Sequence, residues 1–307
     1  VAAWNPPSMA GPAYRACTTD RHLWEIITVT GDPDNPKRSS RISIDWARQE
    51  IERWGRDNPW VMVNVLGEFP PQGMRALISV NDVLAAEKRN PRPNTFESDA
   101  RVWGVDPGYT GNDKSALSRR QGLVARRILA WRGLDGPQLC ARIQQAIISA
   151  ERENQAPDAI FVDRGGVGAS AYDHLMLLGY DKLVWPIDFG GSPDDSRFAD
   201  KRTEMWFNMG EWLKRKPVSL PVDPELAAQL PAAEVEYRVV HKRSVIKLMS
   251  KEQMATKGLP SPNHGDSLAL TFAEPVAPRP GRKLGMPEES KRCKTYDRSK
   301  RRTSSDG

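Results

Sequence analysis

The sequence is poor in cysteine, with only Cys17, Cys140 and Cys293 among 307 residues. Their odd number and wide spacing exclude a disulfide scaffold and a cysteine-based zinc site, and they are typical of a reducing compartment. The sequence also lacks a run of 18 apolar residues, so we expect no transmembrane helix. It contains no G-x-x-x-x-G-K-[ST] motif, which excludes a P-loop for nucleotide phosphates within these residues.

Positive charge is concentrated at the C-terminal end of the chain, whose net charge is +6. Residues 276–307 hold ten Lys or Arg and four Asp or Glu, so the preceding 275 residues are formally neutral. The same segment is rich in Pro, Gly and Ser and has no core-forming pattern, which predicts a disordered basic tail. Such a tail binds nucleic acid by counterion release or serves only as a solubilising end, and both alternatives stay open.

The first 95 residues have few apolar positions and are not expected to form an independent domain. Their patterns predict a strand at 24–30, a helix after an N-cap at Ser43, a strand at 60–67, a short helix at 81–89 and a linker at 90–94.

From about residue 96 to residue 275 the pattern changes to three adjacent strands followed by alternating helices and strands. Strands are predicted at 101–106, 115–120, 123–131, 159–163 and 183–187, with a hairpin at 235–240 and 245–249. Helices are predicted from Pro137, at 169–178, at 198–214, after Ser250 and at about 264–273. This order predicts an α/β fold whose sheet has mixed strand directions and is flanked by helices.

Two of these strands end in an aspartate that is followed by a glycine-bearing turn: Asp106 in VDPG and Asp163 in VDRGG. Sites in open α/β sheets form at the carboxyl ends of strands. Two carboxylates on neighbouring strands repel each other unless a cation or a shared proton lies between them. Hard cations such as Mg²⁺ and Mn²⁺ take oxygen ligands, so the pair indicates a divalent-metal site. The alternative is that each aspartate is a turn or N-cap residue.

A third acid, Asp266, lies in the first turn of the otherwise apolar last helix. It is a candidate third metal ligand, although an acid at this position also complements the helix dipole. His264 is two residues away and is either near the metal or, as we expect, an exposed residue at the start of the helix. Asp113 is a candidate fourth acid or, preferably, a solvated turn residue. Candidates for phosphate contact are Lys114, Arg164, Lys201 and Arg202.

Four segments, in this order, resemble the large terminase subunit of tailed phages. GVDPGYTGNDKSAL (104–117) is similar to the first-strand motif of the family's nuclease domain, and IFVDRGGVGAS (160–170) is similar to its second-aspartate strand and turn. The segment at 250–273 resembles the closing helix, Ser-Pro turn and acid-bearing helix. Residues 31–70 resemble the stretch that joins the family's ATPase to its nuclease.

The resemblance implies a ribonuclease H-like nuclease domain at 96–275, preceded at 1–95 by the end of an ATPase domain and a linker, and followed at 276–307 by the basic tail. It implies a metal-dependent DNA endonuclease of phage DNA packaging that cuts concatemeric DNA by two-metal-ion hydrolysis. Asp106, Asp163 and Asp266 would be both catalytic residues and ligands of two Mg²⁺ or Mn²⁺ ions, with Asp106 bridging them. The implied location is the cytoplasm of the bacterial host.

The resemblance also implies double-stranded DNA as the substrate, and the small terminase subunit, the portal protein and a separate ATPase part as partners, with no membrane. The chain departs from the family because neither Walker motif is present, so we expect no ATPase activity from it. One alternative is a truncated, non-cutting DNA-docking or packaging-assembly module. Another is a different ribonuclease H-like enzyme such as a resolvase or transposase, which would not share the motifs at 31–70.

We predict that deleting residues 276–307 weakens DNA binding at low salt and flattens the slope of log affinity against log salt, because contacts with phosphates act through charge. Cleavage at saturating DNA should persist, since the tail contains none of the three acids. The measurement is a salt titration of DNA affinity with and without the tail. An unchanged slope would exclude the DNA role and favour docking on a protein such as the portal.

Overall fold

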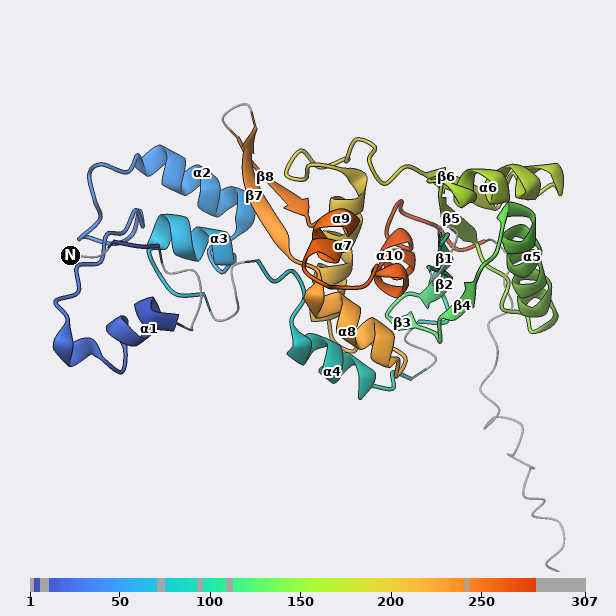
Figure 1. Ribbon diagram of the computed structural model, residues 1–307, viewed down its shortest axis with the longest axis horizontal. Coiled ribbons are helices and arrows are strands. Elements are labelled where there is room, and N and C mark those ends of the chain that lie inside the picture. The colour runs from blue at the N-terminus through green and yellow to red at the C-terminus, as the bar shows by residue number, and fades with distance from the viewer. Residues whose placement is uncertain are drawn as a thin grey trace, which may run out of the picture.

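The structure, a computed structural model, describes residues 3–5, 11–70, 75–92, 96–108, 113–240 and 243–279. The molecule is elongated, with the N-terminal helices at one end and a sheet with two covering helices at the other (Figure 1). Within the described part, no helix has the length and apolar character to span a membrane. The predicted disordered tail lies outside the described residues from residue 280 onward, as does part of the predicted linker, residues 93–95.

A mixed sheet of six strands organises the part of the chain that follows residue 100. Its strands are β1 (Arg101–Asp106), β2 (Lys114–Gln121), β3 (Val124–Ala125), β4 (Leu129–Arg132), β5 (Ala159–Asp163) and β6 (Val184–Ile187). The order is β3-β2-β1-β5-β6, and β4 also pairs with β2. Strand β2 is antiparallel to β1, whereas β5 is parallel to both β1 and β6. The predicted mixed α/β fold is therefore confirmed.

Helices cover both faces of the sheet (Figure 1). Helices α5 (Gly136–Arg152) and α6 (Val167–Leu177) pack on one face, where Trp103 and Val105 belong to their core. Helices α7 (Lys201–Lys214) and α10 (Asn263–Leu270) share a core with Val102 and Phe161 of the other face. Side chains alternate along a strand, so Asp106 points to the same face as Val102, and Asp163 to the same face as Phe161. Both strand-terminal acids thus face α10.

Helix α10 lies unusually close to β1 because Gly104 has no side chain. A Cβ atom at Gly104 would lie 2.1 Å from the backbone oxygen of Ser267 and 2.7 Å from the Cβ of Leu270. A hydrogen bond of 2.7 Å also joins the hydroxyl group of Ser267 to that of Ser118 in β2. The glycine therefore sets the distance at which α10 presents its acid to the end of β1.

The remaining elements lie outside the sheet. They are α1 (Gly11–Cys17), η1 (Arg21–Leu23), α2 (Ile44–Trp54), α3 (Pro59–Val61), η2 (Met62–Leu66), α4 (Val80–Glu87), α8 (Pro224–Ala232), β7 (Val235–Val240), β8 (Arg243–Leu248) and α9 (Lys251–Thr256). Among them α4, α8, β7, β8 and α9 lie near α7 and α10, whereas α1, η1 and α2 lie toward the far end of the molecule (Figure 1). Strands β7 and β8 form the predicted hairpin. Its Tyr237 stacks on Trp60, with ring centroids 5.6 Å apart, and donates a hydrogen bond of 3.1 Å to Asn58. The N-terminal helices thereby pack on the hairpin.

Two predicted strands in the N-terminal part are wrong. Residues 60–67 form α3 and η2, because Asn58 caps a helical turn by accepting a hydrogen bond from the Trp60 N–H. The apolar run is buried on several sides, and its pattern therefore does not separate a strand from a helix. Residues 24–30 lie in irregular chain that pairs with no strand among the described residues, and Ile27 is 81% exposed.

A third prediction, one strand at 123–131, is wrong because the segment is divided into β3 and β4. The first pairs with the end of β2 and the second with its beginning. Arg126 and Arg127 lie between them and are exposed, and the Arg126 N–H bonds to the oxygen of Arg119. In a continuous strand, neighbouring side chains point to opposite faces, so one of these two arginines would be buried. The chain instead leaves the sheet at Arg126 and Arg127, where both side chains reach solvent.

We predict that Gly104→Ala destabilises the protein by about 3 kcal/mol, because a backbone oxygen cannot yield to the new Cβ and α10 has to move from β1. Thermal or urea unfolding measures this change. Gly190→Ala is the matched control, since its nearest contact would be the Oδ1 of Asp188 at an ordinary 3.5 Å. Equal stability of the two variants would contradict the close packing described above.

Candidate active site

Asp106 and Asp163 end two neighbouring parallel strands, and their side chains face the same side of the sheet. In the register of the two strands Val105 is opposite Val162, so the two acids occupy equivalent positions one residue further on. Asp106 is fully buried, whereas Asp163 is partly buried. Asp163 accepts a hydrogen bond of 3.2 Å from the N–H of Gly165, in the turn that begins α6. The strand pairing alone therefore brings the two carboxylates to one edge of the sheet.

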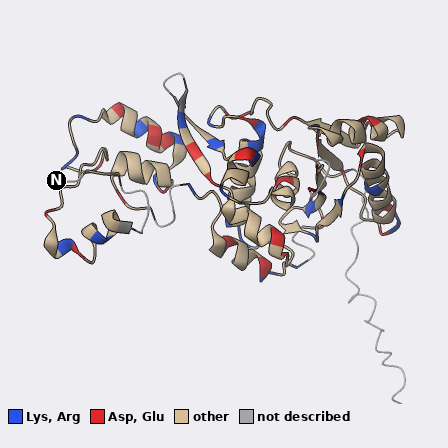
Figure 2. Cartoon of the chain, viewed as in Figure 1, with Lys and Arg blue, Asp and Glu red and all other residues tan. Residues whose placement is uncertain are grey.

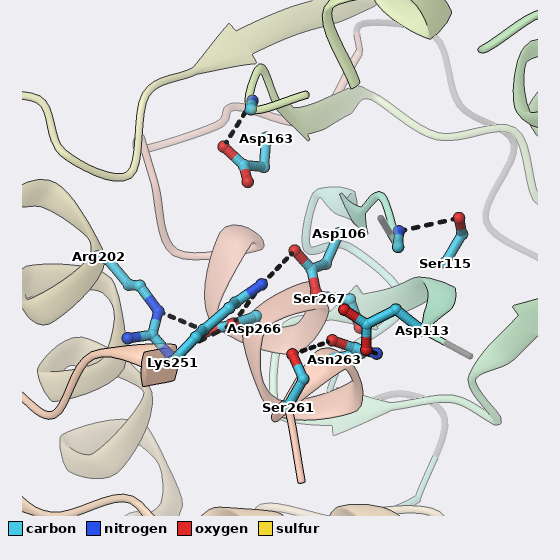
Figure 3. Close-up of polar contacts among 12 residues, drawn as sticks. Asp106, Asp113, Ser115, Asp163, Arg202, Lys251, Ser261, Asn263, Asp266 and Ser267 are labelled. Carbon is cyan, nitrogen blue, oxygen red and sulfur yellow. Dashed lines mark hydrogen bonds and ion pairs between the residues drawn. The ribbon is translucent and has the colours of Figure 1, made fainter. Parts of the chain in front are cut away.

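Asp266 reaches this edge from α10 and is held there by two residues of α7, of which Figure 3 shows Arg202. Its Oδ1 accepts hydrogen bonds from the Nε of Arg202 at 2.8 Å and from the indole N–H of Trp206 at 2.7 Å, and its Oδ2 accepts one from Nη2 of Arg202 at 3.3 Å. Asp266 has no exposed surface. Burial alone would raise the pKa of Asp266, but Arg202 and Lys251 lower it, so the carboxylate is charged.

Lys251 supplies a cation between two of the acids. Its Nζ lies 3.4 Å from Oδ1 of Asp106 and 3.3 Å from Oδ2 of Asp266 (Figure 3). Ser250 caps α9 by accepting a hydrogen bond from the Gln253 N–H, which fixes Lys251 as the first residue of that helix. Burial would lower the pKa of the Lys251 ammonium, but Asp106 and Asp266 raise it above its usual range. The lysine is therefore charged and neutralises part of the cluster.

The Asp106 carboxyl is the most perturbed acid of the cluster. Burial raises its pKa to about 8, with further contributions from the charges of Asp266 and Asp163, while Lys251 and Arg202 oppose the rise. Its Oδ2 is buried and has no hydrogen-bond partner among the described residues. The pKa of Asp163 is also raised, by burial first and then by Asp266 and Asp188. A site for a hard cation requires carboxylate oxygens that are not already bound to donors. Oδ2 of Asp106 meets this requirement, and the raised pKa values show that Asp106 and Asp163 lack sufficient positive charge nearby.

As the side chains lie, no three His, Cys, Asp or Glu residues in the described ranges are grouped closely enough to form a metal cage. The Lys251 ammonium occupies the space between Asp106 and Asp266 that a shared cation would need. The catalytic and metal-binding roles of Asp106, Asp163 and Asp266 therefore stay predictions, supported by their convergence on one edge of the sheet.

The other sequence candidates have mostly structural contacts. Asp113 accepts a hydrogen bond of 3.2 Å from Asn263 at the start of α10. Lys114 forms an ion pair with Glu225, and Lys201 contacts Asp194, Glu204 and Glu274. Arg202 binds Asp266 rather than solvent. Arg164 is exposed beside the Asp163 turn, with its guanidinium 5.8 Å from the ring of Tyr172, and it keeps its candidacy for phosphate contact.

His264 is not the exposed helix-start residue that the sequence suggested. Its side chain is 8% exposed, and its Nδ1 lies 3.1 Å from an oxygen of Asp223. Asp223 is also the N-cap of α8, where it accepts hydrogen bonds from the Glu225 and Leu226 N–H groups. His264 therefore joins α10 to α8.

Sequence reasoning missed three residues of the site: Lys251, Trp206 and Asp188. Lys251 lies in a short polar helix, and its pattern gives no indication of an inward charge. Trp206 belongs to the core, and its indole N–H donates a hydrogen bond to Asp266 from there. Asp188 directly follows β6, whose Ile187 pairs with Asp163. An acid after a third strand of the same sheet was a signal that sequence alone could have found.

Comparisons with known proteins agree with this fold. No family model matches the chain. A probable terminase large subunit of Enterobacteria phage P7 is 26% identical over 279 residues, covering 81% of this chain and 53% of that protein. The chain thus spans about half the length of this relative.

The nuclease domain of the large terminase subunit gp2 of bacterial virus Sf6 is similar in structure. A point mutant of that domain, solved with manganese and beta-thujaplicinol, has a TM-score of 0.53 and 21% identity, covering 66% of this chain and 100% of that one. The domain without these additions gives a TM-score of 0.52, with the same identity and coverage.

The described sheet and its helices have the ribonuclease H-like fold of terminase nuclease domains. The similarity in sequence to one large terminase subunit and in fold to the nuclease domain of another confirms the resemblance predicted from the motifs. The chain is therefore similar in sequence to a large terminase subunit, and its described sheet and helices have the fold of a terminase nuclease domain.

We predict that Arg202→Met destabilises the protein by about 3 kcal/mol, because it leaves the fully buried Asp266 charge without its main partner. Chemical denaturation measures the loss. Arg238→Met is the control, since Arg238 forms an exposed ion pair with Glu236, and such pairs contribute less than about 1 kcal/mol. A loss no larger than that of the control would show that Arg202 is dispensable for holding Asp266.

Proposed function

We propose that this chain is a metal-dependent endonuclease that cuts double-stranded DNA during phage DNA packaging. The observation that carries the proposal is the convergence of Asp106, Asp163 and Asp266 from β1, β5 and α10 on one partly buried edge of the sheet. Similarity to large terminase subunits and to the fold of their nuclease domain supports the choice of DNA as substrate. A terminase nuclease domain solved with manganese supports the choice of cofactor.

The donor set fits Mg²⁺ or Mn²⁺. Asp106, Asp163 and Asp266 offer only carboxylate oxygens, and Oδ2 of Asp106 has no donor among the described residues. Asp106 would be a ligand of two ions, as the resemblance to terminase nuclease domains implies. Such ions, when bound, activate a water molecule and stabilise the leaving oxygen of the phosphodiester.

The residues of the chain orient this set. Arg202 and Trp206 fix the Asp266 carboxylate, and the Gly165 N–H fixes that of Asp163. The Lys251 ammonium balances the charge of Asp106 and Asp266. Arg164, which is exposed after Asp163, would contact a phosphate of the bound strand.

We also propose the division of the chain that the motifs suggest: the end of an ATPase domain with a linker at 1–95, the nuclease domain at 96–275 and the basic tail at 276–307. The partners would be DNA, the small terminase subunit, the portal protein and an ATPase part, in the host cytoplasm. A non-cutting DNA-docking module is the alternative, and the activity assay below separates the two.

We predict that the purified protein nicks or linearises plasmid DNA with Mn²⁺ or Mg²⁺, that a chelator abolishes cleavage, and that ATP has no effect. Asp106→Asn, Asp163→Asn and Asp266→Asn should each lower the rate by at least about a hundredfold, because an amide is a poor ligand for a hard cation. Gel assays of plasmid conversion measure the rate.

Asp181→Asn is the matched control, because Asp181 is exposed in the turn before β6. This variant should cleave DNA at the parent rate. Circular dichroism should show that all four variants are folded. Parent-like cleavage by Asp106→Asn would contradict the assigned site. Binding of DNA without cleavage at any metal concentration would favour the docking module.

We further predict that Lys251→Met raises the affinity for Mn²⁺ severalfold, because it removes a positive charge from between Asp106 and Asp266. Isothermal titration calorimetry measures this affinity independently of cleavage. Lys257→Met is the control, since Lys257 is bound to Glu234 on the outer side of the molecule. Unchanged or weaker Mn²⁺ binding in Lys251→Met would show that the lysine does not compete for the cation position.

A further inference from the structure

A second charged site lies at the opposite end of the sheet from the acids. A pocket of about 630 Å³ is formed there between the sheet, the loop that joins β3 to β4, and the C-terminal half of α5. Arg101, at the start of β1, pairs with Gln121 at the end of β2, and both line the pocket. Asp106 is at the other end of β1. The pocket is therefore separate from the acidic site.

The pocket carries a large excess of positive charge. Its lining includes Arg101, Arg119, Arg120, Arg126 and Arg127 but a single acid, Glu153. In Figure 2 the positions of Lys and Arg on the strands beside α5 are blue. This local charge stands out because residues 1–275 are formally neutral as a whole. Like charges in one pocket repel each other, so the fold bears a cost that an anion would remove.

Two of the arginines have structural partners. Arg120 donates hydrogen bonds to the hydroxyl and carbonyl oxygens of Thr271, at 2.9 and 2.6 Å, and lies 4.2 Å over the ring of Phe272. Arg101 donates one of 2.7 Å to the oxygen of Asn154. These contacts explain the presence of both residues without a ligand.

Arg119 has an unused donor. Its Nη2 bonds the Arg127 oxygen at 3.2 Å, but its Nε is buried and has no hydrogen-bond partner among the described residues. Burial and then the charge of Arg126 lower the pKa of Arg119, and Glu153 opposes this only in part. A buried donor without an acceptor costs free energy in the empty pocket. Arg126 and Arg127 are exposed at the rim.

The geometry points to a binding site for a phosphate-bearing ligand of nucleotide size in this pocket, which we call the Arg119 pocket. The volume lies in the usual range for small-molecule sites and is too small for a duplex. Guanidinium groups match the geometry of phosphate oxygens. Trp103, Leu129, Ala146 and Ala150 supply an apolar wall on which a base or sugar can lie. The phosphate comes either from a free nucleotide or from a nucleotide of a DNA strand.

The test uses the full chain in EDTA, so that the acidic site holds no divalent ion. Binding of dAMP, of inorganic phosphate and of a 12-nucleotide single-stranded DNA is measured by calorimetry. We expect dAMP to bind, and Arg119→Gln and Arg127→Gln to weaken it about tenfold each, the effect of losing one charge-assisted hydrogen bond. Arg142→Gln is the matched control, since Arg142 is exposed on α5 outside the pocket.

The arms separate the two sources. If the Arg119→Gln and Arg127→Gln variants lose affinity for dAMP but keep the parent's affinity for the oligonucleotide, the pocket is assigned to a free nucleotide. A parallel loss for the oligonucleotide, with dAMP as a competitor, assigns it to DNA. Because Arg127 is exposed, its variant tests the pocket even if Arg119→Gln fails to fold. Absence of dAMP binding at millimolar concentration, unchanged binding in both variants, or binding of inorganic phosphate as tight as that of dAMP would overturn the proposal of a nucleotide-sized ligand. These outcomes are independent of whether the acidic site cuts DNA.

Discussion

Asp106 and Asp266 carry two carboxylates into a region that is closed to water, and Lys251 and Arg202 are the cations that allow it. A buried carboxylate without a partner is so costly that it takes up a proton instead. The four residues come from β1, α10, α9 and α7, and the relative positions of these elements are therefore tied to one charge balance. Asp266 has the larger share of donors, which is why its pKa falls while that of Asp106 rises.

The positions of these charged residues relative to the sheet depend on close packing at two glycines. Helix α10 brings Asp266 to the end of β1 only because Gly104 leaves room for its backbone. A similar approach occurs at Gly168, where a Cβ would lie 1.9 Å from the oxygen of Asp163 and 2.8 Å from Pro107. The first turn of α6 thereby lies against the turns that follow both strand-terminal acids. Gly104 thus permits the close approach of α10 to the end of β1, and Gly168 permits the close approach of α6 to the two turns that follow the acids.

The sequence was informative where chemistry and local pattern coincide. Asp106 and Asp163 stand at the end of apolar runs and before glycine turns, so strand and acid could be predicted together. The ion pairs of the site could not, because Lys251 and Arg202 meet Asp106 and Asp266 only through tertiary packing. Arg202 was a candidate for phosphate contact, and Lys251 was not a candidate. The apolar run at 60–67 is buried on several sides, which removes the periodicity that separates helix from strand. Helix α8 went unpredicted, since its Pro231 reads as a helix breaker.

Residues 1–275 are formally neutral as a whole, but negative and positive charges are separated along β1. One end of the strand gathers acids that require cations, and the other end gathers arginines around a pocket with one acid. Opposite charges at this distance across a packed sheet do not neutralise each other, since each desolvated cluster responds mainly to groups within a few ångströms. Each end therefore has to recruit its own counter-charge. At the acidic end Lys251 already supplies part of it from within the chain, whereas the buried Nε of Arg119 still lacks an acceptor among the described residues.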